Sequence, residues 1–313
     1  MIFQEIEGIT PKYSKSILTE TKGTLESFTH SLNPYSGCLF DCSYCYVPKG
    51  FKLAMGEWAK EHWGEWVEPK LNAPQLLKKQ LQSLKSRINV ISIFMGSVTD
   101  PYQPIEKKFQ ITRGILKVIQ NFPVVSLVIQ TRSPLIIRDI NLLKKLNLKL
   151  TGKLIVNMSI TSDDESVRKI YEPKTASYFS RMLVLQKLTK AGIATRATIT
   201  PLLPCNPEKF ARQISKTTNK ISIGLIKDDS SIKAPSLNKY IGASTRERFY
   251  KILPQKDKIF FSSEFYNKTV KIFKEILGEN NVFDWENNNN KTIRKKKFKK
   301  LKQSYSLMSY VKN

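Results

Sequence analysis

Five short apolar runs recur between residues 90 and 226, and a helical pattern separates each run from the next. The runs cover residues 90–95, 124–130, 154–160, 194–200 and 221–226. Segments that are apolar on both faces suit strands of a parallel sheet covered by helices. The alternation therefore predicts an α/β fold built from βαβ units with right-handed crossovers.

The segments between the runs carry apolar residues at helical spacing, which predicts helices over residues 74–86, 106–121, 134–146 and 177–191. A weaker strand pattern around residues 24–32 brings the number of strands to six. Six units favour a partial (β/α)6 TIM-type barrel over a doubly wound sheet, although the alternation alone does not decide between them. In such barrels the chemistry lies on loops that follow the carboxyl ends of the strands.

The two ends of the chain depart from this alternation. We predict an N-terminal extension over residues 1–27, the barrel over 28–255, a C-terminal helical segment over 256–286 with an amphipathic helix near 264–278, and an Asn-rich linker with a basic tail over 287–313. The tail contains KTIRKKKFKKLK, with eight basic residues and no acidic one. We interpret it as a solvated, partly disordered tail in preference to a specific nucleic-acid arm.

Three of the four cysteines fall within eight residues, as Cys38, Cys42 and Cys45 of NPYSGCLFDCSYCY. Three thiolates on one tight loop can bind three irons of a [4Fe–4S] cubane and leave the fourth iron without a protein ligand. Gly37 would relieve backbone crowding beside the cluster, and Pro34 would set the entry of the loop. The clustering favours a metal site in a reducing compartment over a disulfide scaffold.

A structural zinc site is the main alternative for these cysteines. Zinc needs four ligands in tetrahedral geometry, and His62 could complete a set of three cysteines and one histidine. A small zinc module does not ordinarily precede five further βα units. Residues 50–72, which contain His62 and are rich in Gly and Trp, are predicted to form an irregular insertion.

The charge of the chain bears on its partners. The formal net charge is +26, from 52 basic and 26 acidic residues, and such a surface attracts polyanions, of which nucleic acid is the commonest. A lysine-rich composition without selection for binding is the alternative. Apolar runs are too short for a membrane span, and the first thirty residues lack a signal-peptide core, so we expect a cytoplasmic protein without a membrane partner.

The cysteine loop and several later segments resemble one known family. CxxxCxYC after a first strand, followed by βα units, is similar to the radical S-adenosylmethionine (SAM) superfamily. The phrases SLNPYSGCLFDCSYCYVP, GSVTDPYQPIEKKFQITRGIL, IQTRSPLIIRDINLL, ITSDDESVRKIYEP and AGIATRATITPLLP resemble its branch related to spore photoproduct lyase, described broadly as DNA-repair-photolyase-like. The resemblance covers about residues 28–225 in collinear order.

This resemblance implies two cofactors, a [4Fe–4S] cluster on Cys38, Cys42 and Cys45 and SAM on its open iron. One electron from the cluster would cleave SAM to methionine and a 5′-deoxyadenosyl radical, which abstracts a hydrogen atom from the substrate. The protein would position these groups and exclude water. A reducing electron donor of the flavodoxin or ferredoxin type is then expected as a partner.

The candidate cofactor-binding residues are Tyr44, Ser97, Asp100, Arg132 and Ser159. Tyr44 would place a ring against the cluster. The resemblance puts Arg132, after the third strand, opposite the methionyl carboxylate, and a guanidinium can bind both oxygens of a carboxylate. It puts Ser159 near the methionyl or ribose part of SAM. Ser97, Asp100 and Ser159 are also types that commonly cap helices or turns.

Two further residues are weaker candidates. Arg168 lies in DDESVRKIYEP, and an ordinary exposed helix residue is the favoured interpretation. Cys205 lies in PLLPCNP after the fifth strand and could return a hydrogen atom to a product radical, but a plain loop cysteine is favoured.

The sequence therefore predicts a radical SAM enzyme with nucleic acid as the favoured substrate. A radical SAM enzyme that modifies a peptide or metabolite is one alternative. A non-catalytic, zinc-containing nucleic-acid-binding protein is the other. The sequence does not identify the substrate or the oligomeric state.

Overall fold

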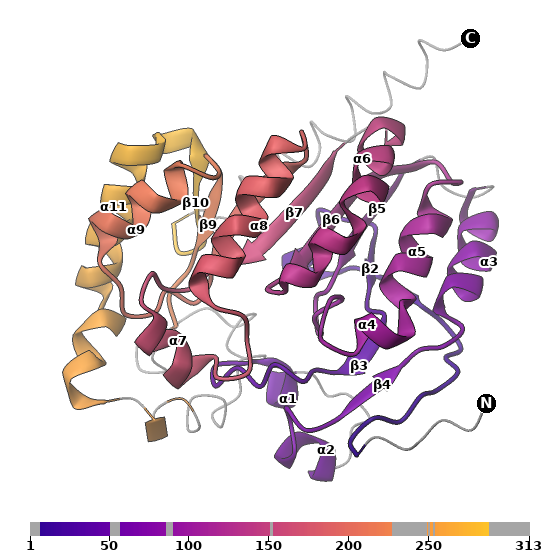
Figure 1. The fold of residues 1–313 in the computed structure, drawn as a ribbon, viewed down its shortest axis with the longest axis horizontal. Coiled ribbons are helices and arrows are strands. Elements are labelled where there is room, and N and C mark those ends of the chain that lie inside the picture. The colour runs from indigo at the N-terminus through magenta and orange to yellow at the C-terminus, as the bar shows by residue number, and fades with distance from the viewer. Residues whose placement is uncertain are drawn as a thin grey trace.

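The computed structural model describes residues 7–50, 57–85, 90–150, 153–226, 249, 251–252 and 254–287. Its centre is an eight-stranded sheet in the order β1-β2-β5-β6-β7-β8-β9-β10 (Figure 1). The strands are β1 (Leu18–Glu20), β2 (His30–Leu32), β5 (Ile91–Met95), β6 (Val124–Thr131), β7 (Leu154–Ser159), β8 (Ala194–Ile199), β9 (Ile221–Ile223) and β10 (Val282–Asp284). β1 pairs antiparallel with β2, and every later pair is parallel.

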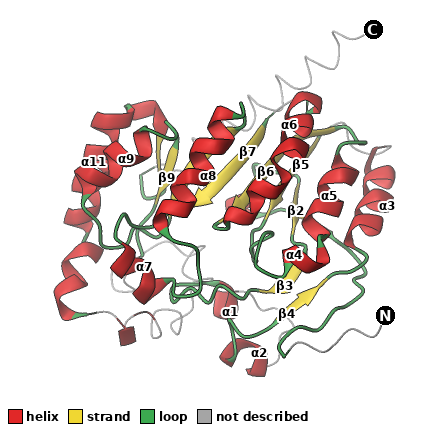
Figure 2. Ribbon diagram, viewed as in Figure 1, coloured by secondary structure: helices red, strands yellow, loops and turns green. Residues whose placement is uncertain are grey.

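Helices cover one face of this sheet, as Figure 2 shows by colour. The helices on this face are α3 (Ala73–Lys85), α5 (Ile111–Ile119), α6 (Ile140–Lys149), α8 (Tyr178–Lys190), α9 (Pro207–Ser215) and α11 (Ser263–Leu277). The described residues also form the short helices α4 (Glu106–Phe109) and α7 (Glu165–Tyr171) and the 3-10 helices η1 (Gly23–Leu25), η2 (Pro134–Asp139), η4 (Gln255–Phe261) and η5 (Glu279–Asn281). Alternate strand residues such as Leu127, Ile129, Val156 and Met158 are buried in the main apolar core. The opposite face carries many polar side chains, so each strand has an apolar face toward the helices and a more polar face away from them.

The five apolar runs are confirmed as strands β5 to β9, with ends within three residues of the prediction. The predicted strand over residues 24–32 is confirmed only at its end, since η1 occupies its beginning. The predicted helix over 106–121 is divided into α4 and α5 at Gln110, whose φ of 49° lies in the left-handed region. The helix predicted over 134–146 begins as η2 after Ser133 and continues as α6.

The segment over residues 50–72 is more regular than predicted. It contains α2 (Glu57–Glu61) and β4 (Val67–Pro69), and α1 (Val47–Gly50) precedes it. β4 pairs antiparallel with β3 (Tyr35–Gly37), the strand that leads into the cysteine loop. The prediction of an irregular insertion is therefore wrong for its described part, because β3 supplies hydrogen-bond partners that the sequence pattern does not reveal.

The C-terminal segment joins the sheet. Helix α11 matches the helix predicted near 264–278, and the three-residue strand β10 that follows pairs in parallel with β9. The βα alternation thus continues past residue 255 and adds a seventh parallel strand to the six expected strands. Residues 288–313, with the basic run, lie outside the described residues. No helix in the described part of the chain is long and apolar enough to cross a membrane.

Candidate active site

The cysteine loop begins at Gly37, the last residue of β3. Gly37 has a φ of 76°, and a Cβ on it would lie 2.5 Å from the carbonyl oxygen of Trp66. A side chain at this position would meet both backbone strain and a clash. Gly37 thus relieves crowding against Trp66, and its predicted role beside the cluster stays a prediction.

Three neighbouring segments hold the loop in place. Thr99 Oγ1 donates to the carbonyl oxygen of Gly37 at 2.5 Å, and the backbone N–H of Leu39 donates to Gln103 Oε1 at 3.0 Å. The N–H of Ser43 donates to the carbonyl oxygen of Tyr171, at the end of α7, at 3.0 Å. The loop after β5 and the end of α7 thus fix the cysteine loop from two sides.

An apolar wall packs against the cysteines. Trp63 and Trp66 are buried with Val47, and Cys38 and Cys45 pack against this cluster. The two indole rings meet edge to face at 5.9 Å between centroids. Both tryptophans come from the segment that the sequence analysis treated as an insertion, and their packing keeps water from two of the three sulfurs.

All three loop cysteines are free thiols. Burial raises the pKa of Cys38, Cys42 and Cys45 to about 12 each, although Arg132 opposes this shift at Cys42. Backbone N–H groups of Phe40 and Asp100 also favour the Cys38 thiolate. Binding of an iron cluster would therefore release a proton from each thiol, as metal binding to cysteine generally does.

The donor set fits a cubane better than a zinc ion. A single zinc draws four ligand atoms around one point, whereas a cubane contacts each thiolate through a different iron and tolerates wider separation. Among the described residues no group of three or more Cys, His, Asp or Glu side chains lies close enough to hold one metal ion. His62, the proposed fourth zinc ligand, stacks on Trp58 at 4.5 Å, and its Nδ1 lies 2.9 Å from the carbonyl oxygen of Trp58.

Arg132 reaches the cysteine loop from the end of β6. Its Nη1 donates to Cys42 Sγ at 2.8 Å, to the hydroxyl of Tyr44 at 2.8 Å and to Glu172 Oε1 at 3.0 Å. The Tyr44 hydroxyl in turn donates to Glu172. No acceptor among the described residues bonds to Nε or Nη2 of Arg132, so two sides of the guanidinium remain open. The structure brings the predicted residues Tyr44 and Arg132 together.

Glu172 is the site residue that sequence reasoning missed. It is fully buried and also pairs with Arg181, which is 2% exposed. Burial alone would raise its pKa, but Arg181 and Arg132 outweigh burial and lower the pKa of Glu172 to about 2. Thr161 Oγ1 donates to it at 3.0 Å. The only sequence signal was its place at the end of ITSDDESVRKIYEP, where a single glutamate resembles any surface residue.

Asp100 positions the segment that carries Arg132. Its carboxylate accepts from Thr131 Oγ1 at 2.7 Å and from the backbone N–H groups of Arg132 and Tyr102, each at 2.8 Å. The side chain is buried, and these three bonds engage both of its carboxylate oxygens. Asp100 thereby acts on the site through Arg132.

The two predicted serines are held by amides from neighbouring segments. Ser97 Oγ accepts from Asn33 Nδ2 at 3.0 Å, and its carbonyl oxygen accepts from the Tyr46 hydroxyl. Ser159 Oγ accepts from Gln130 Nε2 at 2.8 Å. Both serines follow or end parallel strands, at the edge of the sheet where the cysteine loop lies.

The two weaker candidates have structural partners. Arg168 pairs with Glu165 at 2.6 Å and donates to the carbonyl oxygen of Glu172 at 3.0 Å, so it closes the end of α7. Cys205 is buried in the main apolar core, and burial raises the pKa of its thiol. Cys205 lies on the loop between β8 and α9, as the favoured interpretation expects, and it is buried there.

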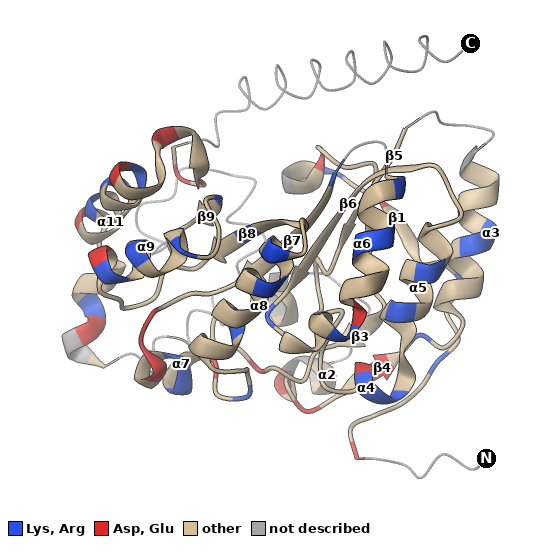
Figure 3. Ribbon diagram, turned by 45° about the horizontal axis from the view of Figure 1, so that its top comes forward, with Lys and Arg blue, Asp and Glu red and all other residues tan. Residues whose placement is uncertain are grey.

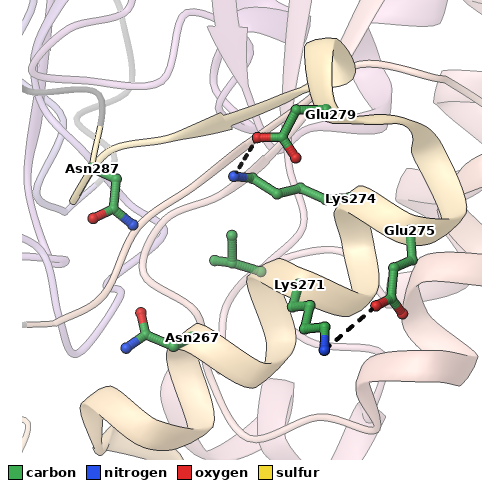
Figure 4. A pocket seen from close by; sticks show the side chains of 7 residues that line it. Asn267, Lys271, Lys274, Glu275, Glu279 and Asn287 are labelled. Atoms are coloured by element: carbon green, nitrogen blue, oxygen red, sulfur yellow. Dashed lines mark ion pairs between the residues drawn. The ribbon is translucent and has the colours of Figure 1, made fainter.

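Basic residues spread along the outer helices α3, α5, α6, α8 and α9 (Figure 3). Exposed examples are Lys117, Lys144, Lys145, Lys187 and Lys190. A pocket beside α11 is also lined with charge, but its lysines are compensated, since Lys274 pairs with Glu279 at 2.6 Å and Lys271 with Glu275 at 3.9 Å (Figure 4). The positive surface therefore lies on the helical layer and not in this pocket.

Known relatives match somewhat more than half of the chain. An uncharacterized protein of Methanocaldococcus jannaschii is 35% identical over 173 residues, which are 55% of this chain and 60% of that protein. An uncharacterized protein of Acidianus two-tailed virus is 29% identical over 182 residues, which are 56% of each. The chain thus matches little more than half the length of these relatives.

The fold has solved counterparts. Spore photoproduct lyase complexed with dinucleoside spore photoproduct superposes with a TM-score of 0.59 at 13% identity, over 88% of this chain and 81% of that one. Residues 32–213, more than half of the chain, match the Radical SAM superfamily. The chain belongs to the radical SAM superfamily and is an enzyme whose cofactors are a [4Fe–4S] cluster and S-adenosylmethionine.

Proposed function

We propose that this enzyme cleaves SAM reductively at a cluster on Cys38, Cys42 and Cys45 and abstracts hydrogen from a nucleic-acid substrate, in the manner of a DNA-repair lyase. The observation that carries the chemistry is the loop of three free thiols beside Arg132 at the carboxyl ends of the parallel strands. Nucleic acid is favoured by the net charge of +26 and by the likeness in fold to a lyase solved with a dinucleoside photoproduct.

The open sides of Arg132 suit the methionyl carboxylate of SAM. Its Nη1 is anchored by Tyr44 and Glu172, which leaves Nε and Nη2 in a fixed orientation. A planar guanidinium with two free N–H edges binds a carboxylate through both oxygens. Asp100 fixes the backbone of Arg132, and Ser159 lies at the same edge of the sheet, where it can accept or donate to the bound cofactor.

The decisive experiment is anaerobic reconstitution followed by reduction with dithionite and an assay for 5′-deoxyadenosine. A cubane gives about four irons with matching acid-labile sulfide per chain, whereas the zinc alternative gives about one zinc and no sulfide. Cys42→Ala should lose both the cluster and the product, while Cys205→Ala, outside the loop, should keep them. Product formation by the Cys42→Ala variant, or wild-type protein without labile sulfide, would refute the assignment.

The substrate class is tested separately by binding of single- and double-stranded DNA at several salt concentrations. Contacts between basic residues and phosphates release counterions, so affinity should fall steeply as salt rises. Absence of salt-sensitive binding at low ionic strength would exclude nucleic acid. The radical chemistry would then serve a peptide or metabolite, the alternative substrate class.

The enzyme also needs a source of electrons. We propose a flavodoxin or ferredoxin in the cytoplasm, where a reducing environment keeps the four described cysteines as free thiols. A flavodoxin with its reductase and NADPH should replace dithionite in the assay. Failure of both flavodoxin and ferredoxin to support turnover, with dithionite active, would contradict this partner.

A further inference from the structure

A row of polar side chains lies on the face of the sheet opposite the helices. On β8, Thr195 is buried toward α8, where its Oγ1 lies 2.8 Å from Thr189 Oγ1, and Ala197 is buried in the main core. Successive strand side chains point to opposite faces. Arg196, between these two residues, therefore projects from the inner face, opposite the helices that cover the sheet.

The neighbours of Arg196 follow from strand register. Asn157 of β7 is aligned with Arg196, and Gln130 of β6 is aligned with Asn157. Gln130 bonds to Ser159 at 2.8 Å and accepts from Thr198 Oγ1 at 3.5 Å, which places all three of these side chains on the same face. Arg196 thus sits among amides and hydroxyls.

Two members of this row have no hydrogen-bond partner among the described residues. Asn157 is 6% exposed, and its Oδ1 accepts no hydrogen bond from any described residue. In the described part of the chain, no carboxylate pairs with the guanidinium of Arg196 and no acceptor bonds to it. Burial lowers the pKa of Arg196, and no acidic group of the described residues opposes this shift. Because a guanidinium stays charged in proteins, a half-buried cation is left uncompensated.

Arg196 lies within one strand length of the edge of the sheet that carries the cysteine loop. It precedes Ile199, the end of β8, by three residues, which corresponds to roughly 10 Å along the strand. The cysteine loop and Arg132 lie at the carboxyl ends of the strands. A group bound at Arg196 would therefore lie on the inner face, deeper than the cofactor.

We propose that Arg196, with Asn157 beside it, binds an oxyanion of the substrate, either a phosphate or a carboxylate group. This inference rests on the proposed function, which supplies the reaction that the bound substrate undergoes. The oxyanion compensates the guanidinium charge, and the Asn157 amide, whose oxygen and nitrogen are interchangeable in position, donates to it. Arg196 is then a substrate-binding residue that sets how far the substrate enters the barrel.

Isothermal titration calorimetry under argon tests the proposal with the reconstituted enzyme saturated with SAM, so that the cofactor occupies Arg132. The two probes are thymidine 5′-monophosphate and succinate. Loss of a hydrogen bond to a charged group costs about 1.5–3 kcal/mol, so Arg196→Gln should weaken the bound probe roughly 10- to 150-fold. Arg212→Gln is the matched control, since Arg212 is exposed on α9, a helix that packs on the main core at the opposite face of the sheet.

A second variant guards against a folding defect. Asn157→Leu removes the unpartnered amide and keeps a similar volume, so it should fold and weaken the same probe severalfold. Binding of the monophosphate that depends on Arg196 would identify a phosphate source, and Arg196-dependent binding of succinate would identify a carboxylate source. Binding of neither probe to wild-type enzyme, or equal binding by the Arg196→Gln and Arg212→Gln variants, would overturn the proposal.

The two proposals fail in different ways. Wild-type protein that forms no 5′-deoxyadenosine under reducing conditions contradicts the proposed function, whatever the probes do. Wild-type protein that forms 5′-deoxyadenosine but binds the probes independently of Arg196 contradicts this inference alone.

Discussion

Arg132 Nη1 donates to Cys42 Sγ at 2.8 Å, so the proposed SAM-binding cation and one of the proposed cluster ligands are in direct contact. The same nitrogen bonds to Glu172, a fully buried carboxylate that also pairs with Arg181. Internal ion pairs therefore hold the side chains beside the cysteine loop in place. Such preorganisation allows a site to bind its ligand without reordering its own groups.

Replacement of Arg132 by lysine tests this arrangement. We expect the Arg132→Lys variant to load the cluster but to bind SAM roughly 10- to 150-fold more weakly. An ammonium keeps the positive charge but cannot donate two parallel hydrogen bonds to a carboxylate. Equilibrium binding of SAM to the reconstituted protein measures the effect. Arg212→Lys on the exposed face of α9 is the matched control, and equal SAM affinity in both variants would show that Arg132 does not bind the cofactor.

Removal of the Glu172 charge should destabilise the fold. Glu172→Gln leaves Arg132 and Arg181 without their shared carboxylate, and breaking a buried ion pair on one side costs about 3–5 kcal/mol. Denaturant unfolding measures the change in free energy. Glu275→Gln, which breaks an exposed pair with Lys271, should change it by about 0.5 kcal/mol or less. Similar losses in both variants would mean that the buried cluster contributes no special stability.

The tryptophan wall predicts an effect on the lifetime of the cluster. Trp63 is 4% exposed and packs with Cys45, so Trp63→Leu would leave space for water and oxygen beside a cluster ligand. We expect normal loading under argon but faster bleaching of the visible absorbance in air. Trp58→Leu is the control, because Trp58 is 58% exposed and stacks on His62. Equal bleaching rates would show that Trp63 does not shield the cluster.

Long strands can be predicted from the sequence, whereas the shortest ones cannot. Strands β5 to β7 have five to eight residues that are largely apolar, so the runs alone locate them, and the six-residue β8 keeps apolar residues at alternate positions. β10 has three residues, VFD, and contains an aspartate, so only its pairing with β9 reveals it. Its Asp284 is fully buried because it accepts from the Tyr266 hydroxyl at 2.6 Å, a partner that no local pattern indicates.

Only part of the candidate site can be predicted from the sequence. The cysteines share one loop, so their spacing in the sequence predicts their proximity in space. Arg132 and Glu172 are forty residues apart, and their contact depends on where β6 and α7 end in the folded sheet. A buried carboxylate at the end of a helix has no signature in a single sequence, since its burial is made possible by two arginines from other segments.

Gly37 allows the strain of the cysteine loop to be separated from its packing. Gly37 and Gly192 have nearly the same φ, 76° and 75°, but a Cβ on Gly37 would lie 2.5 Å from Trp66 O, whereas a Cβ on Gly192 would meet nothing within 4 Å. Gly192→Ala should therefore cost only the strain of the left-handed conformation, about 1 kcal/mol. Gly37→Ala adds a clash with backbone that cannot move without shifting β4 away from the loop.

We expect Gly37→Ala to lower the iron and sulfide content after reconstitution and to destabilise the chain more than Gly192→Ala, as measured by metal analysis and denaturant unfolding. Full cluster loading in Gly37→Ala would mean that the loop adapts to a side chain, and the close approach of β3 to Trp66 would then have no bearing on the cluster.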